Sequence, residues 1–336
     1  TNKTRWQFWF LATLSVLLVV TFVFYLPARF ERNFLREEAD HPQMDMEEMM
    51  HEDMEMDMMH GDEHASAAVL HEEGEVTDGL AVNLNVTPVP VLAGSSTQLE
   101  FFVNEKPDNL PVPFSEIELN HTKLMHVIGV RSDLNEFFHI HPEPLERGAF
   151  EVPLERAIFV ISHMFAFPGT YKLWSEVTKD GVTHAFGHPV IDVQGEGERE
   201  NKQVSFGRNV VAGDYQVSLE LEEPVAKGHE HELSFDIHTL QGSEVTLENY
   251  LGVPMHVAVI KDDLTQFIHT HPESGVVGDH HSTLRFIQEA KAHGEEEAPP
   301  APIGEDETVN FHVVFPEIGL YKVFAQFRPQ GIDLPA

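Results

Sequence analysis

The sequence is organised around Lys123-Leu124-Met125-His126-Val127-Ile128-Gly129-Val130, followed after a short turn by Phe137-Phe138-His139-Ile140-His141-Pro142-Glu143. Branched and aromatic residues on both sides of a polar turn predict a β-hairpin. Residues i and i+2 of a strand project from one face, so His139 and His141 should point the same way. Two adjacent imidazoles beside a Met-His pair on the partner strand indicate the beginnings of a metal site.

The same hairpin returns 130 residues downstream, as Pro254-Met255-His256-Val257-Ala258-Val259-Ile260 and then Phe267-Ile268-His269-Thr270-His271-Pro272-Glu273. Flanking matches, such as Phe167-Pro168-Gly169-Thr170-Tyr171-Lys172 with Phe315 to Lys322, indicate a tandem duplication of one domain. Short, partly alternating runs between turn residues predict an all-β fold of two immunoglobulin-like β-sandwiches. We assign 80–195 to the first sandwich, 196–212 to a linker, and 213–336 to the second, which carries an inserted loop at 275–306.

Composition restricts the classes of function. The 336 residues include 56 acidic and 21 basic side chains, a formal net charge of −35, which argues against nucleic acid and favours cations as partners. Cysteine is absent, which excludes a disulfide scaffold, a thiolate zinc site, an iron–sulfur cluster and a blue-copper centre. Its absence also fits an oxidising compartment. Histidine, the commonest neutral metal ligand, occurs 22 times.

Residues 6–26 contain no charged side chain and are long enough to cross a bilayer of ~30 Å as a helix. Aromatic residues stand near both ends of the run, as in membrane anchors. No small-residue cleavage site follows, so we favour an uncleaved transmembrane helix over a signal peptide or a buried core helix. The flanking charges leave the orientation open. We expect the globular domains on the extracytoplasmic side, either periplasmic or at the cell surface.

Residues 27–79 form an acidic arm rich in methionine and histidine, and eight of the 11 methionines lie between Met44 and Met59. With so few branched or aromatic side chains the arm should remain disordered and flexible. Thioethers select Cu(I), imidazoles accept copper in either oxidation state, and carboxylates concentrate cations. The arm is therefore interpreted as a copper collector. An acidic solvating linker, or an amphipathic helix against a partner, is the alternative.

A third donor is expected where a later strand should return to each hairpin. His163-Met164 precedes the Phe-Pro pair of the first copy, and alignment on the two Phe-Pro pairs places His312 of the second copy at the position of Met164. Adjacent residues of a strand face opposite ways, so one member of each Met-His pair should lie in the core. The expected ligands of the first site are Met125 or His126, His139, His141, and Met164 or His163. Those of the second site are Met255 or His256, His269, His271 and His312.

Several of these segments resemble a known family. The run from Met125 to Leu134, the Phe138-His139-Ile140-His141-Pro142-Glu143 motif, and Tyr250-Leu251-Gly252-Val253-Pro254-Met255-His256 are similar to exported bacterial YtkA-like β-sandwich proteins, which carry a His-x-His-Pro motif. The resemblance covers both globular domains. It implies an exported β-sandwich fold with a link to copper or other heavy metals.

The sequence favours a membrane-anchored, extracytoplasmic copper-binding protein that stores copper, confers tolerance to it, or delivers it to a membrane cuproenzyme. Zinc is less favoured than copper. No nucleophile–base pair or cofactor loop is present, so we do not expect an enzyme. The alternatives are an accessory or structural subunit of a larger membrane complex and, second, a mononuclear copper enzyme.

Overall fold

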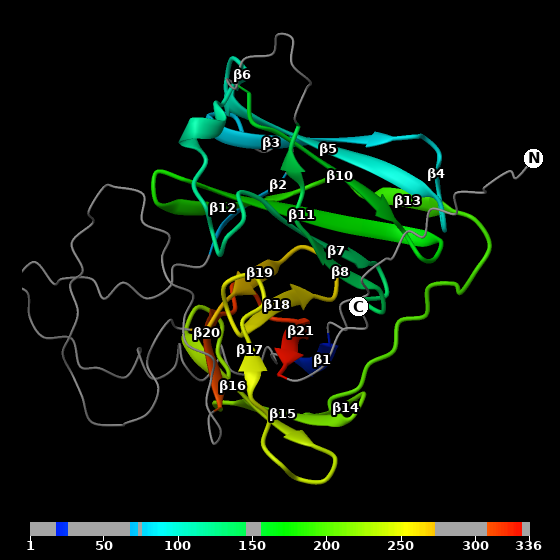
Figure 1. Ribbon diagram of the computed structural model, residues 1–336, viewed down its shortest axis with the longest axis vertical. Coiled ribbons are helices and arrows are strands. Elements are labelled where there is room, and N and C mark those ends of the chain that lie inside the picture. Colours follow the sequence, from blue (N-terminus) through cyan, green and yellow to red (C-terminus); the bar gives the residue numbers. More distant parts are fainter. Residues whose placement is uncertain (1–17, 26–67, 73–75, 146–155, 273–307, 331–336) are drawn as a thin grey trace, which may run out of the picture.

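The computed structural model describes residues 18–25, 68–72, 76–145, 156–272 and 308–330 (Figure 1). Within these ranges the regular structure consists of strands and one short 3₁₀ helix, Phe114–Glu116. The all-β class expected from the short alternating runs is confirmed. The Met/His-rich part of the arm and the inserted loop lie outside the described residues.

The first β-sandwich is built from two sheets (Figure 1). One has the order β3-β5-β10-β9, with β6 beside β5: β3 (Gly79–Thr87), β5 (Ser96–Lys106), β6 (Leu110–Pro111), β9 (Glu143–Pro144) and β10 (Ile158–Met164). The other has the order β2-β12-β11-β13-β4 and adds β7 on β11 and β8 on β7: β2 (Val69–Glu72), β4 (Val91–Leu92), β7 (His126–Arg131), β8 (Phe137–Ile140), β11 (Gly169–Lys179), β12 (Val182–Gly187) and β13 (Ile191–Gln194).

The second β-sandwich repeats this plan. One sheet has the order β14-β15-β16-β20: β14 (Asn209–Ala212), β15 (Tyr215–Leu221), β16 (Glu230–Thr239) and β20 (Val309–Val314). The other has the order β1-β21-β18-β19, with β17 beside β21: β1 (Leu18–Tyr25), β17 (Leu247–Glu248), β18 (Met255–Lys261), β19 (Phe267–Thr270) and β21 (Leu320–Pro329). The antiparallel pairs β7–β8 and β18–β19 confirm the two expected hairpins.

Each sandwich encloses its own apolar core, and a third apolar cluster joins the two. Alternate residues of β7 are divided between them: Val127 lies in the first core, whereas Ile128 and Val130 lie in the joining cluster. Both faces of β7 and β18 are therefore buried, one against the strand's own sandwich and the other against the neighbouring one.

The two domains meet through reciprocal aromatic pairs. Trp174 of β11 stacks on Phe267 of β19 with ring centroids 4.9 Å apart. Phe137 of β8 stacks on Phe324 of β21 at 4.4 Å. Phe137 and Phe267 are equivalent in the repeat, and so are the positions of Trp174 and Phe324 on β11 and β21. The interface thus resembles the self-complementary contact of a twofold dimer, made here within one chain.

The N-terminal apolar run differs from the helix expected there. Residues Leu18–Tyr25 pair antiparallel with β21 along the whole strand. The segment Leu-Val-Val-Thr-Phe-Val-Phe-Tyr is rich in branched and aromatic residues, which favour strands, and the edge of β21 offers backbone groups to pair with. The rest of the span 6–26 lies outside the described residues. Among the described residues, no helix is long and apolar enough to cross a membrane.

Candidate metal centre

The hairpins β7–β8 and β18–β19 lie next to each other where the two domains meet (Figure 1). Six imidazoles from these hairpins and the residues that follow them come together there. Alternation along the strands places them there. On β7, His126 shares a face with Ile128 and Val130, which pack against the second domain. We call His126, His139 and His141 the first triad, and the equivalent His256, His269 and His271 the second triad.

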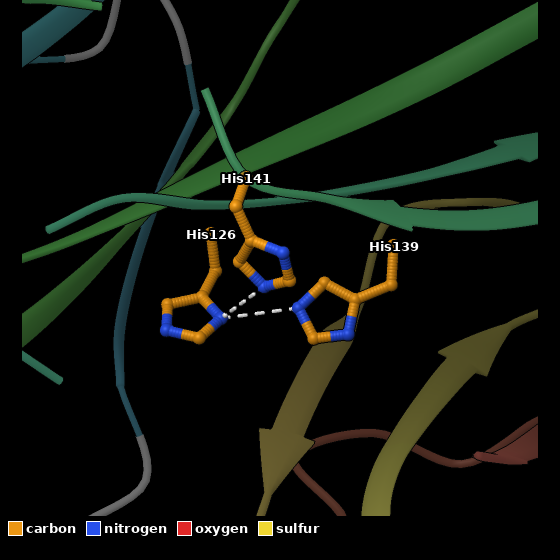
Figure 2. Close-up of side chains that lie close together, drawn as sticks. All are labelled: His126, His139 and His141. Atoms are coloured by element: carbon orange, nitrogen blue, oxygen red, sulfur yellow. Dashed lines mark hydrogen bonds between the residues drawn. The ribbon is translucent and has the colours of Figure 1, made fainter. Parts of the chain in front are cut away.

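The first triad turns three ring nitrogens toward one point, as Figure 2 shows. His126 Nδ1 lies 3.1 Å from His139 Nε2 and 3.1 Å from His141 Nε2. Four nitrogens at 2.0–2.1 Å from a tetrahedral metal ion would lie roughly 3.3 Å from one another. The separations within the first triad are therefore close to those of ligands around one ion.

The second triad places three imidazole rings at a similar spacing on the equivalent hairpin. Its ring centroids lie 4.5 to 5.8 Å apart, compared with 4.6 to 5.3 Å in the first triad. His256 Nδ1, His269 Nε2 and His271 Nε2 are buried, and none has a hydrogen-bond partner within the described part of the chain. These are the nitrogens equivalent to those that converge in the first triad. Buried nitrogens without partners are costly unless a ligand satisfies them.

The outer nitrogens of two imidazoles are held by backbone carbonyls at equivalent positions. His126 Nε2–H donates to the carbonyl of Asn120 at 2.8 Å, and His256 Nε2–H donates to that of Tyr250 at 2.9 Å. A neutral imidazole carries one N–H, so the inward Nδ1 of each of these two rings carries a free lone pair. The two carbonyl acceptors are again 130 residues apart, so equivalent turns of the two copies orient the two rings.

Two further imidazoles are oriented by the opposite domain. His139 Nδ1–H donates to Gln326 Oε1 of β21 at 3.0 Å. His269 Nδ1 lies 2.5 Å from Glu176 Oε2 of β11, and both side chains are 2% exposed. Glu176 pairs with His126 across β11–β7, as Gln326 pairs with His256 across β21–β18, so the two acceptors are equivalent. Each domain thus supplies the group that orients a histidine of the other.

Burial keeps most of these imidazoles neutral. Removal from water is the largest cause, and repulsion from neighbouring imidazoles adds to it. The pKa is lowered to about 4 for His126, to about 3 for His141, and well below the usual value for His139, His256 and His271. Neutral imidazole is the form that binds metal ions.

His121, which the sequence analysis missed, lies at the rim of the cluster. It follows Asn120 in the turn before β7, and its ring centroid is 3.8 Å from that of His271. Burial lowers its pKa to about 4. Leu251 is the equivalent residue of the second copy, so the internal repeat gave no signal for His121. Glu176 and Gln326 were also missed, because acidic and amide residues on strands are common.

The Met-His pairs are divided between core and cluster. Met125 and Met255 are fully buried in the apolar cores of the first and second sandwich, respectively. His126 and His256 occupy the opposite face and join the cluster. The thioethers therefore lie on the far side of the strand from the imidazoles, so the histidine of each pair is the one brought to the site.

The expected third donors do not reach the cluster. His163 and Met164 belong to β10, in the opposite sheet of the first sandwich. His163 packs against Phe138, with ring centroids 4.1 Å apart, and Met164 is 60% exposed. His312 lies on β20, in the opposite sheet of the second sandwich, where its Nδ1 is 3.6 Å from Glu230. The further imidazoles next to each triad come from the neighbouring domain and not from these strands.

The cluster can hold a metal ion. Ligand atoms from His126, His139 and His141 lie within 4.8 Å of one another, and so do ligand atoms from His139, His256 and His269.

Fold and site together define a two-domain β-sandwich protein with a histidine cluster at the domain interface. The chain belongs to the family described as Domain of unknown function (DUF8832), whose model matches residues 75–195 and again 209–334. The YtkA-like resemblance remains a hypothesis beside this match.

No curated protein matches the chain. Two solved structures show a distant likeness. A putative membrane anchored protein from Corynebacterium diphtheriae is 10% identical with a TM-score of 0.21, over 76% of this chain and 52% of that one. Salmonella alpha-2-macroglobulin reacted with methylamine is 10% identical with a TM-score of 0.22, over 77% of this chain and 17% of that one. The chain therefore spans about half of the first structure and about a sixth of the second.

Proposed function

We propose that this protein is a membrane-anchored, extracytoplasmic copper-binding protein that serves copper storage, tolerance or delivery to a membrane cuproenzyme. One contact carries the proposal. His126 and His139 each donate their outer N–H to an oxygen, so the two inward nitrogens, 3.1 Å apart, face each other as lone pairs. Two opposed lone pairs repel, and a cation bound between them converts that repulsion into ligation.

Copper is favoured over zinc by the sequence around the domains. Imidazole suits both metals, whereas the thioethers of the arm between Met44 and Met59 select Cu(I). The net charge of −35 would also concentrate cations near the protein. A soft-ligand arm beside a buried imidazole site suits capture followed by retention, which is a binding role rather than an enzymatic one.

Membrane anchoring is proposed from the uncharged run at 6–26. Crossing a bilayer as a helix requires residues 18–25 to leave the edge of β21. Fractionation tests this part: the full chain should stay with membranes after a high-salt wash, and a chain without residues 1–26 should not. Recovery of the full chain in the wash would contradict the anchor.

The copper proposal is tested on the full chain loaded with Cu(II) and then dialysed against a chelator that strips exposed ions. We expect retained copper with the spectrum of nitrogen ligation. His139→Ala and His269→Ala should each lower the retained amount. The matched controls His163→Ala and His312→Ala lie outside the cluster and should not. Absence of retained copper, or equal loss in the controls, would refute the copper assignment.

A further inference from the structure

The two triads are in direct contact across the domain interface. The ring centroid of His139 lies 5.1 Å from that of His256 and 5.1 Å from that of His269, and the centroid of His126 lies 5.8 Å from that of His269. These separations match those inside each triad. The six imidazoles therefore occupy one continuous buried site.

The site also has internal twofold symmetry. In the first triad the converging atoms are one Nδ1 and two Nε2, and the equivalent atoms of the second triad are its three buried nitrogens without a partner. In both triads the ring that offers Nδ1 is held by a carbonyl of the preceding turn. The middle histidine of each triad is oriented by the other domain, His139 by Gln326 and His269 by Glu176. Aromatic pairs flank the cluster in the same reciprocal way. A group that satisfies one triad therefore has an equivalent position in the other.

We propose that the cluster is a two-ion centre, with one copper ion held by His126, His139 and His141 and a second, adjoining ion held by His256, His269 and His271. The inference rests on the proposed copper-binding function and extends it. One ion cannot satisfy all six inward nitrogens, because copper and zinc sites in proteins take about four ligands. A single ion in either triad would leave the buried nitrogens of the other without a partner.

His139 lies where the two ligand groups meet. It belongs to the group with His126 and His141 and also to the group with His256 and His269. Ions in the two triads would therefore be separated only by imidazole rings, with no apolar layer between them. At that proximity the unpaired electrons of two Cu(II) ions couple magnetically, whereas copper held on the acidic arm would give isolated signals.

The test is electron paramagnetic resonance of the full chain at increasing Cu(II) loading. We expect the half-field signal of a coupled Cu(II) pair to grow at high loading. His141→Ala and His271→Ala remove the least enclosed ligand of the first and second triad, respectively. Each should abolish the pair signal and leave one isolated nitrogen-ligated copper. His163→Ala and His312→Ala, which change histidines outside the cluster, should keep the pair.

The outcomes separate the two proposals. Copper retained at full loading with only isolated signals in the native chain would overturn the two-ion centre and leave copper binding standing. A pair signal that survives both His141→Ala and His271→Ala would place the pair elsewhere and would also overturn it. A chain that retains no copper at all would overturn both. Because the native chain alone gives a decisive signal, a variant that fails to fold does not prevent the test.

Discussion

Replacing Glu176 by Gln changes one charge and almost no volume beside the second triad. Glu176 Oε2 accepts from His269 Nδ1 at 2.5 Å, in a place where both side chains are 2% exposed. A carboxylate acceptor makes the opposite ring nitrogen a stronger donor to a metal than an amide does. The first triad already has the amide, because Gln326 accepts from His139. Glu176→Gln therefore makes the two sites chemically alike.

The magnitude follows from replacing a charged hydrogen-bond acceptor by a neutral one. Hydrogen bonds to charged groups contribute about 1.5–3 kcal/mol, compared with about 0.5–1.5 for neutral ones. Loss of an outer-shell partner typically weakens metal binding about 10- to 100-fold. We expect Glu176→Gln to lower the affinity for one of the two copper ions by a factor in this range and to leave the affinity for the other unchanged.

The assay is competition against a chromophoric chelator, which distinguishes tightly bound from weakly bound copper ions on the full chain. The reciprocal variant Gln326→Glu should raise the affinity for the copper ion of the first triad. Glu200→Gln is a matched control, because Glu200 accepts from Ser132 and from the backbone of Thr170 outside the cluster. Equal weakening of both ions by Glu176→Gln, or no change in either, would refute the role assigned to the cross-domain carboxylate.

Four further predictions concern stability. Burial lowers the pKa to about 4 for His121 and His126 and to about 3 for His141, whereas the pKa in the unfolded chain is about 6.5. The unfolded chain thus binds more protons below that pH, so the metal-free protein should lose on the order of 3 kcal/mol or more as pH falls from about 6.5 to 4 in urea titrations, and a flat profile would contradict the burial. Met125→Ala should cost about 2–5 kcal/mol while copper content stays unchanged; loss of copper with normal folding would make Met125 a ligand. Gly129→Ala should cost about 1–3 kcal/mol, because the new Cβ would lie 2.1 Å from the Phe138 ring, and Phe138→Leu in the same chain should recover part of it. Trp174→Ala removes the 4.9 Å stack on Phe267 and should cost about 3–5 kcal/mol by thermal unfolding, whereas an unchanged midpoint would show that the interface does not stabilise the chain.

Local pattern was enough to predict the hairpins. Branched and aromatic residues flank polar turns at both copies, and antiparallel pairs form there. The period of two along a strand also determines that His139 and His141 point together and that Met125 and His126 point apart. These are short-range properties of the backbone, and they hold wherever the strand is placed.

Which side of the strand faces the site is a property of the packed domains. Both faces of β7 are buried, so hydrophobicity alone does not distinguish the core of the first sandwich from the face that meets the second. The third donors expected at His163 and His312 failed for a related reason. The strands that carry them belong to the opposite sheet, where the His163 ring packs on Phe138 and His312 Nδ1 lies near Glu230 instead of a cluster imidazole.

The sequence by itself determined the strands, the tandem repeat and the pairs of histidines that each hairpin presents. Only the tertiary structure decided that the two hairpins face each other, that Glu176 and Gln326 orient histidines of the opposite domain, and that His121 closes the rim. The physical reason is that strand alternation is encoded within a few residues. The cluster instead depends on the docking of two sandwiches, through aromatic pairs more than 90 residues apart in the chain.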